Sequence, residues 1–278
     1  MRPTLHVLML GGVAGCLLGL VAGGLAAGQQ TGEQQSQPTL PTPVPPPGAK
    51  TPEPAKREFT LEDRADLFMA RKAYADAVDY YHRALAAKGR TNAALWNKLG
   101  IAQQQQMNYR EARKAYKEAI RRDKDFSEPW NNLGTTYYLE DKPKKSLKYY
   151  RQAIKLNPSA ASFHLNLGTA YYRQKKVILA IEEYRTALML DPNVLTDRST
   201  LGTVMQPRGL TDVKFYFYMA KVYASLGRAE EAVRYLRRSF EDGFDDLKLL
   251  DDDPDFKKLS EFPAYLELRK NLPKAIKE

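Results

Sequence analysis

The segment Trp96-Asn97-Lys98-Leu99-Gly100 recurs twice along the chain. Its second copy is Trp130-Asn131-Asn132-Leu133-Gly134 and its third is His164-Leu165-Asn166-Leu167-Gly168, at steps of 34 residues. Self-similarity at a fixed period of this length indicates an array of small structural units that stack on one another. The repeat, and not any single residue, is therefore the unit from which fold and function are inferred.

Further columns around these segments repeat in the same register. Three places after the glycine stands a glutamine or a tyrosine, and twelve places after it stands a small residue. A tyrosine, an alanine and a closing position follow, and the closing position is proline in two copies. The columns hold Gln103, Tyr137 and Tyr171; Ala112, Ser146 and Ala180; Tyr116, Tyr150 and Tyr184; Ala119, Ala153 and Ala187; and Lys124, Pro158 and Pro192. The pattern resembles the tetratricopeptide repeat family, whose Trp, Leu-Gly, Tyr, Ala, Tyr, Ala and Pro positions it matches residue by residue.

The resemblance implies an all-α fold, a right-handed superhelical solenoid of about five helix-turn-helix repeats with a C-terminal capping helix. Thr60-Leu61-Glu62-Asp63 is spaced for a capping box at the start of the first helix. We expect the insert between the fourth and fifth repeats to be a surface loop, with a docking loop beside the groove as the alternative. The expected repeats span about 58–91, 93–126, 127–160, 161–194 and 213–246, with the insert at 195–212 and the capping segment at 247–278.

Small residues are expected where the two helices of a repeat cross. Gly134 and Gly168 would leave no room there for a larger side chain, so a change of either to Leu should lower the free energy of unfolding by roughly 2–4 kcal/mol. Tyrosines are expected to fill the remaining gaps between helices. The expected pairs are Tyr137 with Tyr150 and Tyr171 with Tyr184.

The N-terminal segment is typical of an export signal. A single charge at Arg2 precedes an apolar stretch, residues 5–28, that ends in small residues. This arrangement predicts a secretory signal cleaved before Gln29, and hence a periplasmic or secreted protein of a bacterial envelope. Two alternatives remain: an uncleaved membrane anchor, since the stretch is long enough to span a bilayer, and lipidation of Cys16.

Residues 29–57 are expected to form a linker. They are rich in proline and glutamine, and every aromatic residue of the chain follows them. Such a segment cannot bury enough apolar surface to offset the entropy lost on ordering. The folded domain must therefore begin after about residue 57.

No motif for catalysis, phosphate binding or metal binding stands out. The single cysteine, Cys16, excludes an internal disulfide framework. The three histidines are too scattered for a metal cage, and we expect His164 to pack in the tryptophan column. The cluster Asp251-Asp252-Asp253-Pro254-Asp255 lacks the alternating ligands and central glycine of a calcium loop and favours a helix start instead. We therefore expect no enzymatic activity, no cofactor and no metal.

The resemblance also implies a peptide-binding groove lined by the first helix of each repeat. The groove-facing positions are Asn97, Ile101, Gln104, Gln105, Asn131, Thr135, Tyr138, Leu139, Leu165, Thr169, Tyr172, Arg173, Lys214, Phe217 and Lys221. They do not reproduce the Lys/Asn/Arg carboxylate clamp of chaperone-binding members of the family. We expect a scaffold or adaptor with a protein or peptide partner, and not a nucleic acid.

Tyr138 and Tyr172 each stand one position after a core tyrosine, a rotation of about 100° around the helix. We expect that rotation to carry them from the seam between helices to the groove wall, beside Arg173. An aromatic wall with a guanidinium suits an extended or helical peptide that carries an acidic group. Loss of these two rings would then weaken binding and hardly change stability, whereas loss of Tyr137 and Tyr171 would lower stability.

The chain has a formal net charge of +10, and its excess lies in the repeats. Residues 58–240 carry 32 basic and 20 acidic side chains, many of the basic ones on the expected second helices. We expect these helices to form a solvated outer face that keeps the protein soluble. The alternative is docking of an anionic partner there, such as a membrane surface or an acidic polymer, by a structural envelope factor.

Overall fold

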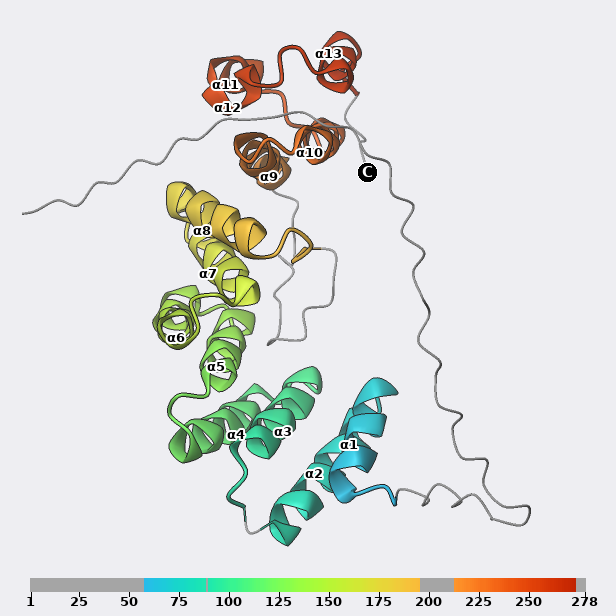
Figure 1. Cartoon of the computed structure of the whole chain (residues 1–278), viewed down its shortest axis with the longest axis vertical. Coiled ribbons are helices and arrows are strands. Elements are labelled where there is room, and N and C mark those ends of the chain that lie inside the picture. The colour runs from blue at the N-terminus through green and yellow to red at the C-terminus, as the bar shows by residue number, and fades with distance from the viewer. Residues whose placement is uncertain (1–57, 89, 196–212, 274–278) are drawn as a thin grey trace, which may run out of the picture. The chain divides into compact units, whose positions relative to one another are not determined.

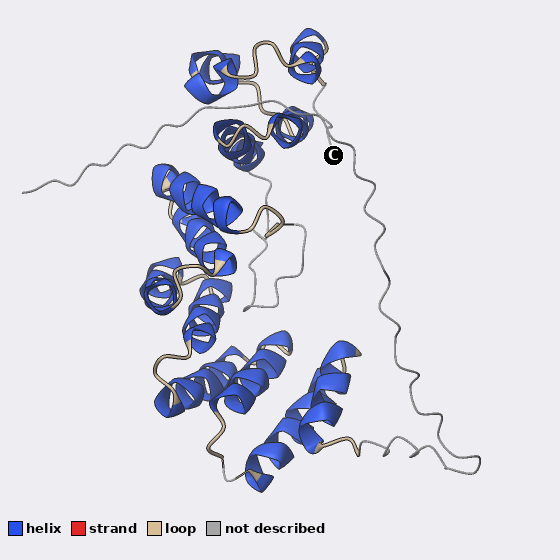
Figure 2. Ribbon diagram, viewed as in Figure 1, coloured by secondary structure: helices blue, strands red, loops and turns tan. Residues whose placement is uncertain are grey.

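The computed structural model describes residues 58–88, 90–195 and 213–273, all of which belong to one of the chain's two units, Lys56–Glu278. Within these ranges every regular element is an α-helix (Figures 1 and 2). The expected signal, the linker and all of the insert except Leu195 lie outside the described residues. The helices are α1 (Leu61–Ala70), α2 (Tyr74–Ala87), α3 (Ala93–Gln105), α4 (Tyr109–Arg122), α5 (Ser127–Leu139), α6 (Pro143–Leu156), α7 (Ala161–Arg173), α8 (Val177–Leu190), α9 (Val213–Ser225), α10 (Ala229–Glu241), α11 (Leu247–Asp252), α12 (Pro254–Lys257) and α13 (Pro263–Lys270).

The first ten helices pack as five consecutive pairs. α1 packs on α2, α3 on α4, α5 on α6, α7 on α8 and α9 on α10, and each second helix also contacts the first helix of the next pair. The first helices of neighbouring pairs touch as well, α3 with α5 and α5 with α7. The expected all-α array of five repeats is therefore confirmed.

A residue in the left-handed conformation makes the turn inside every repeat. In each turn the backbone N–H of the next residue bonds the carbonyl five positions earlier, as Asn108 does to Gln103 at 2.9 Å. This is the Schellman ending of a helix, which glycine normally supplies. Only the fifth repeat uses glycine there, so the other four turns carry a modest strain. The left-handed residues, with φ between 57° and 72°, are Lys72, Met107, Asp141, Lys175 and Gly227.

The two helices of a repeat cross at one small and one large residue. A Cβ built on Gly134 would stand 2.8 Å from the ring of Tyr150, and one on Gly168 would stand 2.8 Å from the ring of Tyr184. Contacts this short are not tolerated, so the glycines allow the helices to approach until the tyrosine rings are fully buried. The fifth repeat has Ala220 and Leu236 at the equivalent positions, and both are completely buried.

A second pair of positions, twelve residues apart in every repeat, fills the gap beside this crossing; we call it the seam pair. In the third repeat Tyr137 stacks on Tyr149, with ring centroids 5.2 Å apart and planes 7° apart. The expected partner of Tyr137, Tyr150, is instead taken up by the glycine crossing. The five seam pairs are Phe68/Tyr80, Gln103/Ala115, Tyr137/Tyr149, Tyr171/Glu183 and Tyr223/Tyr235.

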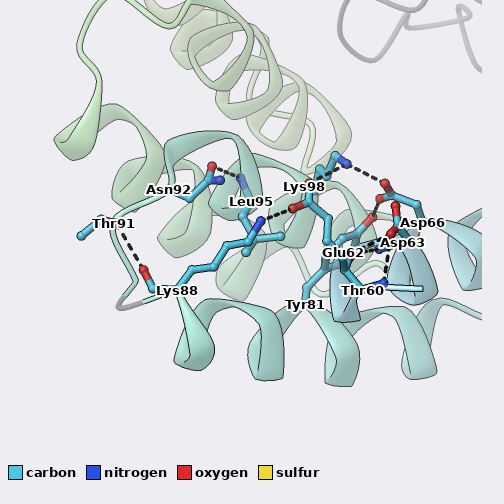
Figure 3. A network of polar contacts seen from close by, with 10 residues as sticks. All are labelled: Thr60, Glu62, Asp63, Asp66, Tyr81, Lys88, Thr91, Asn92, Leu95 and Lys98. Carbon is cyan, nitrogen blue, oxygen red and sulfur yellow. Dashed lines mark hydrogen bonds and ion pairs between the residues drawn. The ribbon is translucent and has the colours of Figure 1, made fainter. Parts of the chain in front are cut away.

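The first and second repeats are joined by a network of polar contacts (Figure 3). Lys98 of α3 lies 2.6 Å from Asp66 and 3.0 Å from Glu62, both on α1. Lys88 at the end of α2 binds Glu62 at 2.7 Å, and the Tyr81 hydroxyl donates to Asp66 at 2.6 Å. Partial burial opposes the charge of Lys98, but its bonds to the two carboxylates outweigh that effect and raise its pKa.

Both ends of the repeat array are capped. At the start, the backbone N–H of Asp63 donates to the Thr60 hydroxyl and the Asp63 carboxylate accepts from the Thr60 N–H, which confirms the capping box. At the end, three short helices replace the single expected one, because Pro254 and Pro263 each start a new helix. α12 packs on α9 and α13 packs on α10.

The C-terminal helices cover the last repeat with apolar side chains, as their sequence predicts. Phe256 and Leu268 are completely buried, whereas Leu266 is 52% exposed. Asp253 caps α12 by accepting from the N–H of Asp255 at 2.9 Å. The acidic cluster therefore includes a helix start, as expected.

Gly134→Ala should lower the free energy of unfolding by about 1–3 kcal/mol, because the new Cβ overlaps the Tyr150 ring. Tyr150→Leu alone should also destabilise, since it leaves a cavity. The double variant reproduces the Ala220/Leu236 pair of the fifth repeat and should lose less than the sum of the single changes. Urea denaturation of all four proteins measures this coupling, and strictly additive losses would refute the crossing argument.

Candidate partner-binding surface

The structure divides the fifteen expected groove residues by burial. Three are exposed: Gln105, Arg173 and Lys214. Four are partly buried: Ile101, Leu139, Tyr172 and Lys221. The other eight are buried: Asn97, Gln104, Asn131, Thr135, Tyr138, Leu165, Thr169 and Phe217. Many positions expected to meet a partner therefore contribute to the interior of the protein.

Buried asparagines link the second, third and fourth repeats. Asn132 donates to Asn97 at 3.1 Å, Asn131 to Asn132 at 3.2 Å, and Asn166 to Asn131 at 2.9 Å. The chain of amides runs across three first helices, α3, α5 and α7. Two of these links span 35 residues and so tie each repeat to the next. Because buried amides are costly to leave unpaired, this ladder fixes how neighbouring repeats meet.

Three more of the expected groove residues hold the core tyrosines. The Tyr150 hydroxyl donates to Thr135 at 3.2 Å, and the Tyr184 hydroxyl lies 3.5 Å from the Thr169 hydroxyl. In the second repeat the Tyr116 hydroxyl donates to Gln104 at 3.1 Å. These polar side chains give the buried tyrosine hydroxyls a hydrogen-bond partner, which explains why polar residues stand at these buried positions.

The expectation that Tyr138 lies open on the groove wall is wrong. Its side chain is only 6% exposed and packs in the same apolar cluster as Tyr150 and Tyr171. Tyr137, expected in the core, is the more exposed of the two neighbours. The close approach of α5 to α7 encloses Tyr138, so we now expect loss of its ring to lower stability.

Tyr172 and Lys221 also contact other side chains of the protein, although both were expected to face a partner. The Tyr172 ring meets Phe215 and Tyr218 edge to face, with centroids 5.4 and 6.2 Å away. The Lys221 ammonium lies 2.5 Å from Asp253 and 3.2 Å from Asp255 of the C-terminal cap. Lys221 therefore anchors the capping segment to the fifth repeat.

Arg173 is the expected groove residue best placed to meet a ligand. Its guanidinium, 45% exposed, reaches Asp141 at 2.9 Å and lies 5.9 Å from the centre of the Tyr138 ring. Asp141 is itself 73% exposed and sits on the turn after α5. An ion pair this open to water is weak, so the guanidinium can exchange Asp141 for another carboxylate at little cost.

The residues at the tryptophan position of the repeat, Trp96, Trp130 and His164, make the same hydrogen bond in three repeats. In each, a ring N–H faces the carbonyl six residues earlier, which fixes the ring beside the loop that opens the repeat. The contacts are Trp96 to Arg90 at 3.0 Å, Trp130 to Lys124 at 3.2 Å, and His164 Nε2 to Pro158 at 3.0 Å. His164 therefore packs as an indole substitute, as expected.

His164 differs from the tryptophans in also binding a carboxylate. Its Nδ1 lies 2.7 Å from Glu183, the seam residue of the same repeat. Burial opposes the charged ring, but the bonds to Glu183 and to the Pro158 carbonyl outweigh it and raise the pKa of His164 above its ordinary value of 6.5. With acceptors at both nitrogens, the protonated ring is the form that satisfies both contacts.

Comparison with known proteins identifies the repeats. Models described as tetratricopeptide repeat match residues 97–143, 127–160, 161–194 and 213–241. The chain is a tetratricopeptide repeat protein. Such proteins generally act as non-catalytic scaffolds for protein–protein interaction. No curated protein matches the chain.

Several solved structures are similar to the chain. A structure of MamA is 21% identical, with a TM-score of 0.45, over 64% of this chain and 93% of its own. YrrB, described as a tetratricopeptide repeat protein with an unusual peptide-binding site, is 16% identical with a TM-score of 0.43, over 76% and 91%. PilF from Pseudomonas aeruginosa is 18% identical with a TM-score of 0.47, over 72% and 79%.

A membrane-spanning helix and a metal site would each require particular features of the described residues. No helix there is long and apolar enough to cross a membrane. Nor does any group of three or more His, Cys, Asp or Glu among those residues have the arrangement to hold a metal ion.

The sequence contains a signal for the asparagine ladder, because the linked asparagines are 35 residues apart and stand in adjacent columns of successive repeats.

Protonation of His164 should stabilise the fourth repeat. Because the folded pKa is raised, this contribution is fully present below pH 6.5 and is lost as the pH rises through the folded pKa. His164→Trp keeps the ring N–H but cannot titrate, so its melting temperature relative to the parent should rise between pH 6 and pH 8. A difference that stays constant across this range would contradict the assignment.

Proposed function

We propose that this tetratricopeptide repeat protein is a scaffold of the cell envelope that binds an acidic peptide segment of another protein along its first helices. The observation that carries the proposal is Arg173 at the end of α7, a half-exposed guanidinium whose carboxylate partner, Asp141, is itself largely in water. A partner's carboxylate can replace Asp141 without breaking a buried contact. The ring of Tyr138 below the guanidinium keeps it in place.

The surroundings of Arg173 suit an elongated ligand. Leu139 on α5 and Tyr172 on α7 are partly exposed and offer apolar area near the same helix ends. Gln105 is exposed at the end of α3 and Lys214 at the start of α9, where a longer ligand would find further polar side chains. A peptide with an acidic residue beside an apolar one would use these features together.

Location in the envelope rests on the N-terminal sequence. The single basic residue, the apolar stretch at residues 5–28 and the Pro-rich segment 29–57 together have the order of an export signal and a spacer. A spacer of this composition would hold the repeats away from a membrane if the signal stayed attached or Cys16 were lipidated.

A second candidate function uses the outer face. Helix α6 carries five basic residues and no acidic one in fourteen positions, and Lys144, Lys145, Lys148 and Lys155 are all exposed. Such a stripe favours an anionic partner through its field. In that case the protein would be a structural or polymer-associated envelope factor.

The variant Arg173→Glu distinguishes binding at the first helices from binding at the outer face. The partner is first identified by crosslinking in the native envelope, and its binding is then measured by calorimetry. The charge reversal should weaken binding at least tenfold, as loss of a charged hot spot does, with no change in the melting temperature. Lys148→Glu on α6 is the matched control and should leave the affinity unchanged. Loss of binding with Lys148→Glu alone would instead support the outer face.

Sequencing of the N-terminus of the native protein tests the proposed location. A start at Gln29 is expected and would support export with cleavage. An acylated Cys16 would support a lipoprotein, and an intact Met1 in the membrane fraction would support an anchor. An intact Met1 in the soluble cytoplasmic fraction would overturn the proposal.

A further inference from the structure

An open cleft lies between α2, α3 and α4, where the first repeat meets the second. Its volume is about 590 Å³, and its walls include Trp96, Leu99, Gln103 and Ala115. It is formed mainly by α4 and one side of α3, with His82 of α2 at its edge, so Arg173 and the ends of α5 and α7 form no part of it.

The seam pairs account for the open space at this point of the second repeat. The first, third and fifth repeats fill the position with two aromatic rings, with centroids 5.2, 5.2 and 5.0 Å apart. The fourth repeat uses Tyr171 together with the ion pair of Glu183 and His164. The second repeat has Gln103 and Ala115 instead, so the volume of two rings is missing.

Trp96 marks the end of an interrupted stack. In the third repeat the stack continues from Trp130 to Tyr149 and from Tyr149 to Tyr137, with centroid distances of 6.4 and 5.2 Å. In the second repeat Trp96 has no ring beyond it within the repeat, and the guanidinium of Arg122 lies 4.8 Å from its centre. An aromatic ring brought by another molecule would complete the stack.

Gln103 adds a specific polar feature. Its side chain is 8% exposed, and its Oε1 has no hydrogen-bond donor among the residues that the structure describes. A buried acceptor without a donor is unfavourable, and a ligand donor would relieve that cost. Gln103 lines the cleft, and a phenol hydroxyl on an incoming ring has the chemistry to donate to its amide oxygen.

The rim of the cleft is basic. It carries five cations, from Arg90, Lys114, Lys117, Arg121 and Arg122, against the carboxylates of Glu111 and Glu118. Both carboxylates are already paired, Glu111 with Lys114 at 2.9 Å and Glu118 with Arg121 at 2.6 Å. The remaining positive charge favours acidic residues on either side of the inserted ring.

We propose that this cleft binds a tyrosine side chain of a partner protein, flanked in the partner's sequence by acidic residues. The ring takes the vacant seam position beside Trp96, the hydroxyl donates to Gln103 Oε1, and the flanking carboxylates meet the basic rim. This site is separate from the peptide surface at Arg173 and does not depend on the function proposed for it.

The proposal is tested with a blocked pentapeptide that has tyrosine at its centre and two glutamates on each side, titrated into the full-length chain. The tyrosine peptide should bind and shift the Trp96 indole resonance in NMR spectra. A phenylalanine-centred peptide should bind about tenfold more weakly, because it cannot donate to Gln103. An alanine-centred peptide should show no saturable binding. Equal affinity of all three peptides, or no binding of the tyrosine peptide, would overturn the proposal.

The decisive variant gives the second repeat the seam pair of the third repeat. Gln103→Tyr with Ala115→Tyr rebuilds the Tyr137/Tyr149 pair, so it should fill the cleft, retain the helical circular dichroism spectrum and weaken peptide binding more than about thirtyfold. Undiminished binding by the folded double variant would refute the site.

If the double variant does not fold, charge variants test the same site. Lys117→Glu on the rim should weaken the tyrosine peptide about tenfold, whereas Lys148→Glu on α6 should not. The shift of the Trp96 indole resonance distinguishes the cleft from the surface at α5 and α7, because Trp96 lines the cleft and Arg173 does not. Equal losses for Lys117→Glu and Lys148→Glu, or a dimer of the chain that Gln103→Tyr/Ala115→Tyr dissolves, would contradict binding of a partner's tyrosine.

Discussion

The crossing of a small residue with a large one sets the spacing on which the remaining contacts depend. With Gly134 against Tyr150 and Gly168 against Tyr184, the two helices of a repeat approach until a single added methyl group would overlap the ring. That separation places the tyrosine hydroxyls within reach of Thr135 and Thr169. The crossing thus positions the inner face, where the asparagine ladder joins one repeat to the next.

The recurring columns, through the family that they resemble, were sufficient to predict the helix pairs. They were not sufficient to predict which first-helix positions stay open. Tyr138 follows a core position by one residue, and helical rotation alone places it outside the seam. Its burial depends on the contact between α5 and α7, which is a property of two repeats and not of one.

Some local features had no signal in residue type. Lys72, Met107, Asp141 and Lys175 adopt a left-handed conformation that a sequence search assigns to glycine. They do so because each turn is closed by the same backbone hydrogen bond, whose pattern the helix pair imposes. The division of the capping segment did have a signal, since Pro254 and Pro263 each start a new helix where a single helix was expected.

The second repeat tolerates its missing rings because a repeat array is held by local contacts. Gln103 and Lys98 are five residues apart on α3, which places them about 140° apart around the helix. On the side of Lys98, two carboxylates of α1 tie the first repeat to the second. On the side of Gln103, Arg122 covers Trp96 and bonds the Arg90 carbonyl in place of a ring. The ion pairs of Lys98 and the apolar cluster around Leu85, Leu95 and Leu99 hold the first two repeats together, so the second repeat does not need an aromatic seam pair of its own.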